Sequence, residues 1–155
     1  EASLREQIAR MVNSELLTSE QARGIDIKNI LRFFQNSIGI RLMNAPYYKR
    51  EIPFSLALPA KEAYAKWNQV EDEYVLVQGV IDCIFEDEEG LTLIDYKTDA
   101  ITGKYKGGFE EAKPILEERY RTQIELYTKA IEYIWKKPLT NRYLYYFDGG
   151  HLLRL

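Results

Sequence analysis

This sequence has very little of three features that mark large classes of proteins: cysteine, histidine and long apolar runs. It contains one cysteine, Cys83, and one histidine, His151. A single cysteine excludes an intrachain disulfide, a four-cysteine zinc site and a four-cysteine iron–sulfur cluster. No apolar stretch reaches the roughly 18 residues that a membrane-spanning helix needs, and no signal peptide is visible. These absences predict a cytoplasmic protein without a membrane span, a disulfide framework or an iron–sulfur cluster.

The chain also lacks an excess of positive charge. It has 21 Lys and Arg side chains against 24 Asp and Glu, which gives a net charge of −3. Domains that hold DNA mainly by charge are basic, so this balance argues against a stand-alone protein of that class. A nuclease is still allowed, because a metal site is itself acidic and the DNA can be held elsewhere. With 155 residues, 46% of them hydrophobic, the chain is long enough for one domain spanning residues 1–155.

Helical periodicity dominates the first third of the chain. Residues 2–17 are predicted to form an amphipathic helix with these core positions: Leu4, Ile8, Met11, Val12 and Leu16. Thr18 or Ser19 would cap a second short helix that ends near Gly24. Asp26 would cap a third helix with these inner residues: Ile27, Ile30, Leu31, Phe34 and Ile38.

Strand and turn signals dominate the rest. A strand over 48–58, limited by Pro53, precedes a charged, partly helical segment over 59–72. A hairpin is predicted over 74–86 and 91–98, then a linker over 99–108. A long helix follows, with Pro114 in its first turn and its end near Lys137. A last strand over 141–147 turns into residues 151–155. This order predicts an α/β or α+β fold with a small mixed sheet flanked by helices.

The hairpin is the most informative segment. Its turn, Asp87–Gly90, ends on a glycine that can take a positive φ. The loop has an even number of residues, so the numbers of two residues that face each other across the hairpin sum to 177. Asp82 then lies opposite Asp95. Because strand side chains alternate between faces, Asp95 and Lys97 share a face, and Asp82 joins them across the ladder.

Asp82 and Asp95 are the best candidates for metal ligands. Each sits in an apolar run, where an acid is costly to bury without a partner, and two neighbouring acids repel unless a cation lies between them. The carbonyl of Tyr96 is a natural further ligand. Lys97 would orient the attacking water or stabilise charge on phosphorus, which points to Mg²⁺-assisted phosphodiester hydrolysis. The alternatives are two solvated acids on an edge hairpin and a simple salt bridge between Lys97 and Asp95.

A second motif lies on the long helix. Gln123 and Tyr127 are four residues apart, so they share one helix face that can lie over the hairpin. An amide and a phenol offer hydrogen-bond donors for a phosphate or for a water molecule. Gln-x-x-x-Tyr is a weak signal alone and a strong one after Asp-Tyr-Lys-Thr.

Together, Asp-x12-Asp-x-Lys and Gln-x-x-x-Tyr resemble the PD-(D/E)xK nuclease superfamily in its RecB-like branch. Further segments resemble the C-terminal nuclease domain of the AddA subunits of bacterial AddAB helicase–nucleases: residues 50–54, 77–82, 93–99 and 145–147. The resemblance covers nearly the whole chain. It implies a restriction-endonuclease-like αβββαβ core with extra N-terminal helices. It also implies that Glu51 occupies an acidic position that touches a second metal ion or a bridging water, the alternative being an exposed strand carboxylate.

The same resemblance implies an activity and a setting. The activity is Mg²⁺-dependent hydrolysis of unwound single-stranded DNA, with Mn²⁺ accepted as a substitute, during the processing of double-strand breaks for recombinational repair. The setting is a longer chain with ATP-binding helicase domains and an AddB-like partner subunit. Three alternatives stay open: a catalytically incomplete docking or DNA-binding module, a phage-type nuclease and a restriction-type nuclease.

Two departures from the branch pattern stand out. Ile81 precedes Asp82 where the superfamily name has proline, which is common in this branch. The branch also carries a metal-binding His in a Gly-Thr-x-x-His context on an N-terminal helix, and this chain has no such motif. Because the sequence starts at Glu1, we expect a fragment that begins after that His and that alone binds metal weakly or is inactive. The basic, aromatic linker Lys104–Gly108 is either a solvated loop or a DNA-backbone contact.

Overall fold

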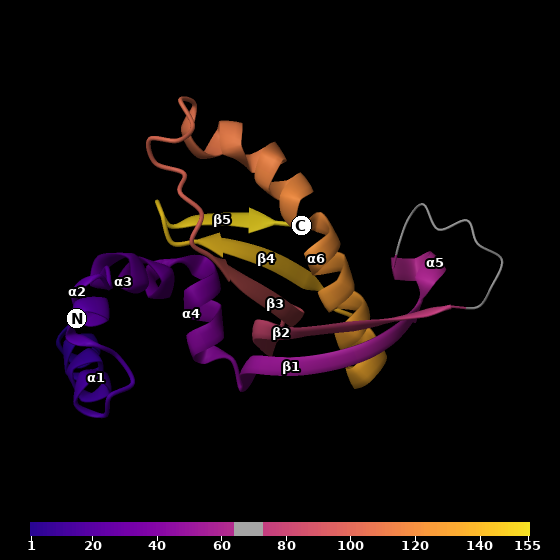
Figure 1. Cartoon of the computed structure of the whole chain (residues 1–155), viewed down its shortest axis with the longest axis horizontal. Coiled ribbons are helices and arrows are strands. Elements are labelled where there is room, and N and C mark those ends of the chain that lie inside the picture. The colour runs from indigo at the N-terminus through magenta and orange to yellow at the C-terminus, as the bar shows by residue number, and fades with distance from the viewer. Residues whose placement is uncertain (64–72) are drawn as a thin grey trace.

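The computed structural model describes residues 1–63 and 73–155, and a mixed five-stranded sheet forms its centre. The strands are Tyr47–Pro59 (β1), Tyr74–Asp87 (β2), Gly90–Lys97 (β3), Asn141–Tyr146 (β4) and His151–Arg154 (β5). They lie side by side in chain order (Figure 1). The β3–β4 pair is parallel and the other neighbouring pairs are antiparallel, so the predicted mixed α+β architecture is confirmed.

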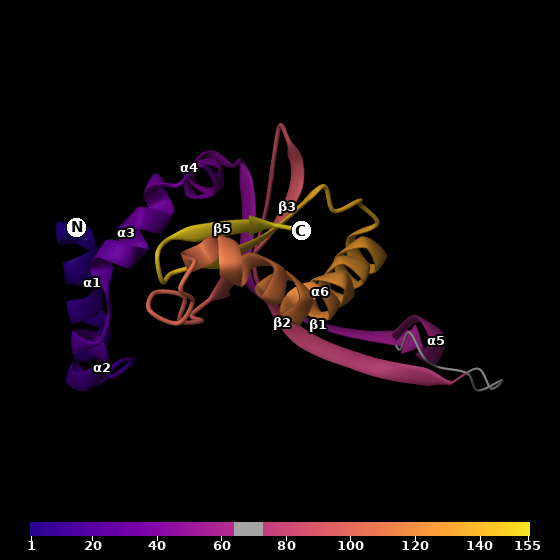
Figure 2. The same ribbon diagram turned by 90° about the horizontal axis from the view of Figure 1, so that it is seen from above.

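Helices flank the sheet on both sides (Figure 2). They are Ala2–Asn13 (α1), Ser19–Arg23 (α2), Ile27–Gln35 (α3), Ser37–Asn44 (α4), Ala60–Ala63 (α5) and Gly108–Trp135 (α6). None of the helices in the described ranges is long and apolar enough to cross a membrane. The predicted helical character of 59–72 is seen only at its start, α5, because residues 64–72 lie outside the described residues.

The alternation of β3 side chains builds a separate core on each side of the sheet. Leu93 packs with the α6 residues Leu116 and Ile124, whereas Ile94 packs with Phe33 of α3 and Cys83 of β2. Burial raises the pKa of the Cys83 thiol to about 11, as expected for a cysteine that serves as a small apolar core residue. Because each face of β3 packs on its own core, a polar side chain of β3 can contact only the elements that lie on its own face.

The N-terminal helix differs from its prediction. α1 ends at Asn13 and has no buried residue. The predicted apolar stripe is only half-buried, and Leu16 is 70% exposed. The helix packs against α2, which is too short to cover a stripe of that length.

The helix predicted from Asp26 onward is in fact two helices. Asn36 is extended, with φ −74° and ψ 151°, and its side chain caps α4 by accepting a hydrogen bond from the Ile38 amide at 3.1 Å. The break changes the inward face, so Phe33 is buried while Phe34, predicted to be core, is 39% exposed.

The long helix begins earlier than predicted. The Glu111 carboxylate accepts the Gly107 amide at 2.7 Å, which satisfies a free N–H at the helix start. Pro114 therefore lies in the second turn of α6, not in the first. The helix ends at Trp135, close to the predicted boundary, with Lys136 in a left-handed conformation.

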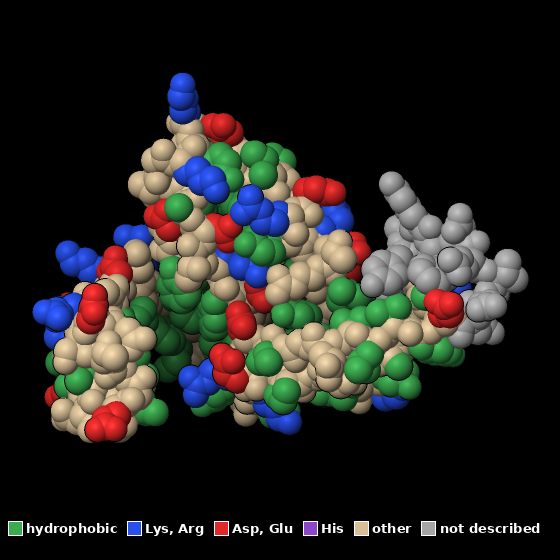
Figure 3. Space-filling view, in the orientation of Figure 1, with side chains coloured by type: hydrophobic (Ala, Val, Ile, Leu, Met, Phe, Trp, Pro, Cys, Tyr) green, Lys and Arg blue, Asp and Glu red, His purple; other side chains and the backbone are tan. Residues whose placement is uncertain are grey.

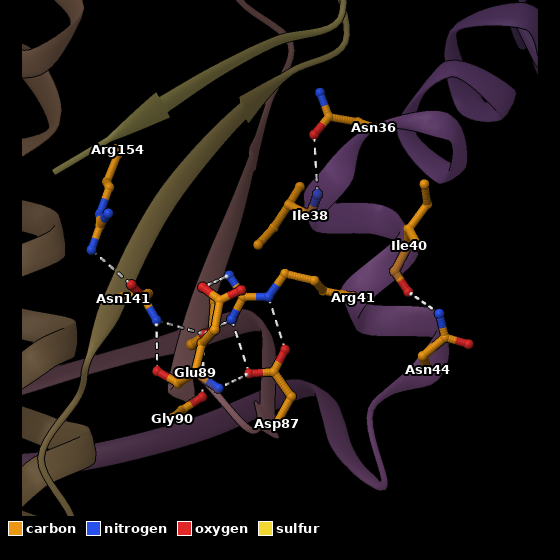
Figure 4. A network of polar contacts seen from close by, with 11 residues as sticks. Asn36, Ile38, Ile40, Arg41, Asn44, Asp87, Glu89, Gly90, Asn141 and Arg154 are labelled. Atoms are coloured by element: carbon orange, nitrogen blue, oxygen red, sulfur yellow. Dashed lines mark hydrogen bonds and ion pairs between the residues drawn. The ribbon is translucent and has the colours of Figure 1, made fainter.

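An ion-pair network fastens α4 to the turn between β2 and β3 (Figure 4). Arg41 donates to both carboxylate oxygens of Asp87 at 2.8 and 2.9 Å and lies 2.9 Å from Glu89. Asn141 of β4 donates to the Glu89 carbonyl at 3.2 Å. The turn glycine, Gly90, has φ 96°, as the hairpin prediction requires.

Candidate active site

The site forms where β2 leaves β3. The two strands pair from Asp87–Gly90 to Cys83–Ile94, and every pair sums to 177, which confirms the predicted register. Past that point the ladder stops. The Asp82 Oδ2 atom accepts a hydrogen bond from the Tyr96 amide at 2.8 Å, so a carboxylate takes the place of a ladder carbonyl.

Asp95 is the most buried charged group of the site, with 2% of its surface exposed. Its Oδ2 atom lies 2.5 Å from the Lys97 ammonium but receives no well-oriented hydrogen bond from the described residues. Burial raises the pKa of Asp95, and the nearby Asp82 carboxylate raises it further, while Lys97 opposes the shift. The pairing of β2 with β3 ends before Asp82 and Asp95, so the shared metal site of these two acids stays a prediction.

Gln123 connects the hairpin to α6. Its carbonyl oxygen accepts a hydrogen bond from Lys97 Nζ at 2.9 Å, and its amide donates to Asp95 Oδ1 at 3.4 Å and to the Tyr127 hydroxyl at 2.9 Å. Burial raises the pKa of Tyr127, and so do both carboxylates, which keeps the phenol protonated at neutral pH. The structure therefore joins four residues expected from the sequence, Asp95, Lys97, Gln123 and Tyr127, in one network of contacts. The fifth, Asp82, is held by the amide of Tyr96, between Asp95 and Lys97 in the chain.

Sequence reasoning missed the residues that hold Lys97 from its other side. The Lys97 ammonium lies 3.9 Å from the centroid of the Tyr120 ring. The Tyr120 hydroxyl donates to Asp99 at 2.6 Å, and Arg119 donates to the other Asp99 oxygen at 2.7 Å. Tyr120 is three residues before Gln123 on α6, and this helical spacing could have placed it on the same face as Gln123 from the sequence. The ammonium is thus enclosed by a carboxylate, an amide oxygen and an aromatic face.

Gly79 makes room for this packing. A Cβ at this position would lie 2.9 Å from Phe54 Cε1 and 3.5 Å from Tyr127 Cε1. The Phe54 and Tyr127 rings meet edge-to-face with centroids 5.5 Å apart. The absence of a side chain at Gly79 lets the phenol that contacts Gln123 approach the β2 backbone.

The strand pairing places Glu51 next to the site, but its side chain does not join the cluster of contacting residues. Its neighbours pair as Arg50–Cys83 and Ile52–Ile81, which leaves Glu51 facing Asp82. It has φ 50°, rare for a residue other than glycine, and its side chain is exposed. Across residues 1–63 and 73–155, no three His, Cys, Asp or Glu side chains come close enough to hold a metal ion. A metal-binding role for Glu51 stays a prediction.

The single histidine and a tyrosine of the basic linker also lie in packed surroundings. His151 stacks on Phe109, with ring centroids 4.3 Å apart and planes 2° from parallel. Tyr105 of the basic linker is half-buried against the core on the α6 side.

The oxygen donors of the site fit a hard divalent cation. Asp82 and Asp95 supply carboxylates, the Tyr96 carbonyl lies between Asp95 and Lys97 in the chain, and Asp95 Oδ2 is a buried oxygen that lacks a hydrogen bond from the described residues. Mg²⁺ is commonly held by one or two carboxylates, with water and substrate phosphate completing its shell. The residues present therefore match that type of ion.

Comparison with known proteins gives consistent results. Proteins named as the A subunits of ATP-dependent helicase/nucleases are 51% identical to 99% of this chain in Bacillus cytotoxicus and 52% identical to all of it in Bacillus cereus strains Q1 and ATCC 10987. The chain spans 12% of the length of these relatives. No protein-family model matches the chain.

Proposed function

Because this chain is homologous along its whole length to a segment of the A subunits of ATP-dependent helicase/nucleases, we propose that it is the nuclease domain of a helicase–nuclease. The domain would be of the PD-(D/E)xK type and hydrolyse phosphodiester bonds of single-stranded DNA with Mg²⁺, or with Mn²⁺ in its place. One observation carries the proposal: Asp95, Lys97 and Gln123 contact one another directly beside Asp82, at the point where β2 and β3 separate.

Asp82 and Asp95, with the Tyr96 carbonyl, would hold the ion. When bound, Mg²⁺ supplies a Lewis acid that offsets phosphate charge and lowers the pKa of water. The hydrogen bond from the Tyr96 amide fixes one oxygen of Asp82 and leaves the other available. The burial of Asp95 makes an unpaired negative charge costly there, so the site favours a cation beside it.

Lys97 would place its positive charge where negative charge develops on the transferred phosphorus. Its ammonium has three donors, and in the structure these face Asp95 and Gln123 while the Tyr120 ring covers one side. Gln123 holds the ammonium through its oxygen and the Tyr127 hydroxyl through its amide. These contacts limit the rotamers of Lys97 and so orient it for the reaction.

The proposed setting follows from the relatives' name. We propose that helicase domains of the same chain deliver unwound single-stranded DNA and that an AddB-like partner completes the complex. The process would be repair of double-strand breaks by recombination, in the cytoplasm. The net charge of −3 fits a domain to which other parts of a complex bring the DNA.

A second candidate function is a docking module with an incomplete catalytic site. It is favoured by the finding that, in the described ranges, fewer than three His, Cys, Asp or Glu side chains meet at any one point. Such a module would keep the fold and its contacts with a helicase but bind no metal ion at Asp82 and Asp95.

The decisive experiment measures cleavage of end-labelled single-stranded DNA by the full-length protein with Mg²⁺. We expect Asp95→Asn to lower the rate by about 1000-fold or more, because a metal-binding carboxylate is lost. Glu88→Gln, which removes an exposed carboxylate at the hairpin turn, is the matched control and should leave the rate unchanged.

Calorimetry with Mn²⁺ separates the two candidates. A nuclease should release or absorb heat on binding Mn²⁺, and Asp82→Asn should abolish that heat. A docking module should show no heat on addition of Mn²⁺ and no DNA cleavage, both in the parent protein and in Asp82→Asn. Resistance of the substituted domain to limited proteolysis, equal to that of the parent protein, would show that each variant is folded. An Asp95→Asn rate within twofold of the parent protein would overturn the nuclease assignment.

A further inference from the structure

A small aromatic pocket lies on the side of the sheet opposite α6. It has a volume of about 260 Å³ and lies between the helices α3 and α4 and the strands β1 and β3. Its walls include Phe33, Phe34, Met43, Tyr48, Arg50 and Tyr96. Figure 3 shows hydrophobic side chains lining the recess between the N-terminal helices and the sheet.

The pocket and the candidate active site lie on opposite faces of the sheet, and both use residues of β3. Tyr96 contributes its ring to the pocket and to the core of α3 and α4, whereas its neighbours Asp95 and Lys97 face α6. Arg50 likewise pairs with Cys83, next to Asp82. Tyr96 and Arg50 thus connect the pocket to residues adjacent in the chain or across the ladder to the two carboxylates. The pairing of β2 with β3 ends at the same place, between Cys83–Ile94 and these carboxylates.

The pocket combines a rigid floor with an exposed rim. Phe33 on the floor is 3% exposed and meets the Tyr96 ring edge-to-face, with centroids 5.3 Å apart. On the rim, Phe34, Tyr48 and Met43 are 39%, 53% and 67% exposed. Flat apolar groups that remain open to solvent beside a fixed aromatic floor suit a planar ligand.

The rim also carries a positive charge. The Arg50 guanidinium lies over the Tyr48 ring, 5.5 Å from its centroid. Across residues 1–63 and 73–155, every ion pair uses other charged groups, so Arg50 has no carboxylate partner there. An aromatic face and a guanidinium without a carboxylate partner in the described ranges are together complementary to a base and its phosphate.

We propose that this pocket binds one nucleobase of the single-stranded DNA whose backbone lies at Asp82 and Asp95. The base would stack on Tyr48 while Arg50 contacts the adjoining phosphate. This inference rests on the proposed nuclease function and adds a base-binding subsite to it. Stacking on an aromatic side chain accepts any base, so the pocket would position the strand without selecting its sequence.

The test uses single-stranded oligonucleotides that carry 2-aminopurine at one position at a time, bound to the full-length protein in EDTA. Stacking on an aromatic ring quenches 2-aminopurine fluorescence. We expect strong quenching at one or two neighbouring positions, retained in Tyr48→Phe and lost in Tyr48→Leu. Tyr74→Leu changes an exposed tyrosine of the outer part of β2 and is the matched control, which should leave the quenching unchanged.

Cleavage kinetics give a second readout. With Mg²⁺, Tyr48→Leu and Arg50→Gln should each raise KM for a short oligonucleotide by about 5-fold or more, with a smaller change in kcat. Quenching that persists in Tyr48→Leu would overturn the subsite. So would a Tyr48→Leu variant that loses only its association with a protein partner. Failure of the nuclease function would appear separately, as undiminished cleavage by Asp95→Asn, so the two hypotheses fail by different measurements.

Discussion

The two halves of strand β3 have different surroundings and different residues. In the half from Gly90 to Ile94, β3 is paired with β2 throughout and with β4 from Thr92 onward, and Leu91, Leu93 and Ile94 are at most 3% exposed. In the half from Asp95 to Lys97, β4 still pairs but β2 has departed. The paired half is a core strand, whereas the open half carries the ionic groups.

This difference shows why the charged groups can be held where they are. Within a complete ladder, a buried carboxylate would have few donors to accept from, because the backbone groups bond to one another. The departure of β2 frees the Tyr96 amide for Asp82, while Gln123 of α6 reaches Asp95 from the face of the sheet. We therefore expect substitutions near the open half to change activity, and substitutions at the paired half to change stability.

Among the residues that surround the ionic groups, the largest effect is expected for Tyr120, which covers the Lys97 ammonium. Tyr120→Leu removes the aromatic face and should lower kcat for DNA cleavage by roughly 10- to 30-fold, since a desolvated cation–π contact contributes about 2 kcal/mol. Tyr120→Phe keeps the ring and loses only the hydrogen bond to Asp99, so its kcat should stay within about threefold. Initial rates at saturating DNA give the comparison.

A double-mutant cycle shows whether Tyr120 acts through Lys97. In a Lys97→Ala background, Tyr120→Leu should cause no further loss of activity, because the cation it positions is absent. Equal losses in both backgrounds would mean that Tyr120 has only a general structural role. Thermal unfolding of each variant checks that the fold is retained.

A smaller effect is expected at Gly79, where β2 passes close to two rings. Gly79→Ala should push on Phe54 and, through the edge-to-face contact of that ring, shift Tyr127. This should lower kcat by roughly 3- to 10-fold through the loosened contact with Gln123. It should also cost about 1–3 kcal/mol of unfolding free energy, as overpacking does. Gly24→Ala is the matched control, because its Cβ would make an ordinary 3.4 Å contact. Unchanged kinetics in Gly79→Ala would contradict the inferred link between this packing and the site.

Asp87 of β2, which pairs with the first residue of the paired half of β3, gives the contrasting prediction, an effect on stability alone. The hydrogen bonds from Arg41 lower the pKa of Asp87 from its ordinary value of 3.8, and both side chains are 17% exposed. A lowered pKa in the folded state means that the ion pair stabilises the protein above pH 3.8 and that this stabilisation is lost as the pH falls through the folded-state pKa.

Asp87→Asn should therefore lower the unfolding free energy by about 1–3 kcal/mol at neutral pH, with little change in cleavage. The deficit should shrink as the pH falls below 3.8 toward the lowered folded-state pKa of Asp87, because proton binding then begins to favour the unfolded parent protein. Urea titrations at pH 7 and near pH 3 measure it. Loss of cleavage at full stability would reverse the roles assigned to the two halves of β3. The network in which Asp87 takes part is drawn in Figure 4.

Much of this site was accessible to pattern reasoning, because it depends on local spacing. The alternation of strand side chains placed Asp95 and Lys97 on one face, and the loop length fixed the register with the preceding strand. Helical spacing likewise placed Gln123 and Tyr127 on one face of α6. Strand alternation, hairpin register and helical spacing follow the same rules in any hairpin or helix, whatever packs against it.

Other features depended on contacts between distant segments. The break at Asn36 exchanged Phe34 for Phe33 in the core, and the stripe of α1 remained half-buried because no large surface covers it. A periodic pattern indicates which residues share a face, but not whether a partner meets that face.

The sequence by itself determined the order of elements, the hairpin register and the identity of the polar residues, because each follows from short-range geometry of the backbone. Only the tertiary structure decided that β2 leaves β3 at Asp82, that Tyr120 covers Lys97, and that Tyr48 and Arg50 border a pocket across the strand. Those features arise where α3, α4 and α6 pack on opposite faces of one sheet. They depend on distances between residues far apart in the chain, which no local pattern encodes.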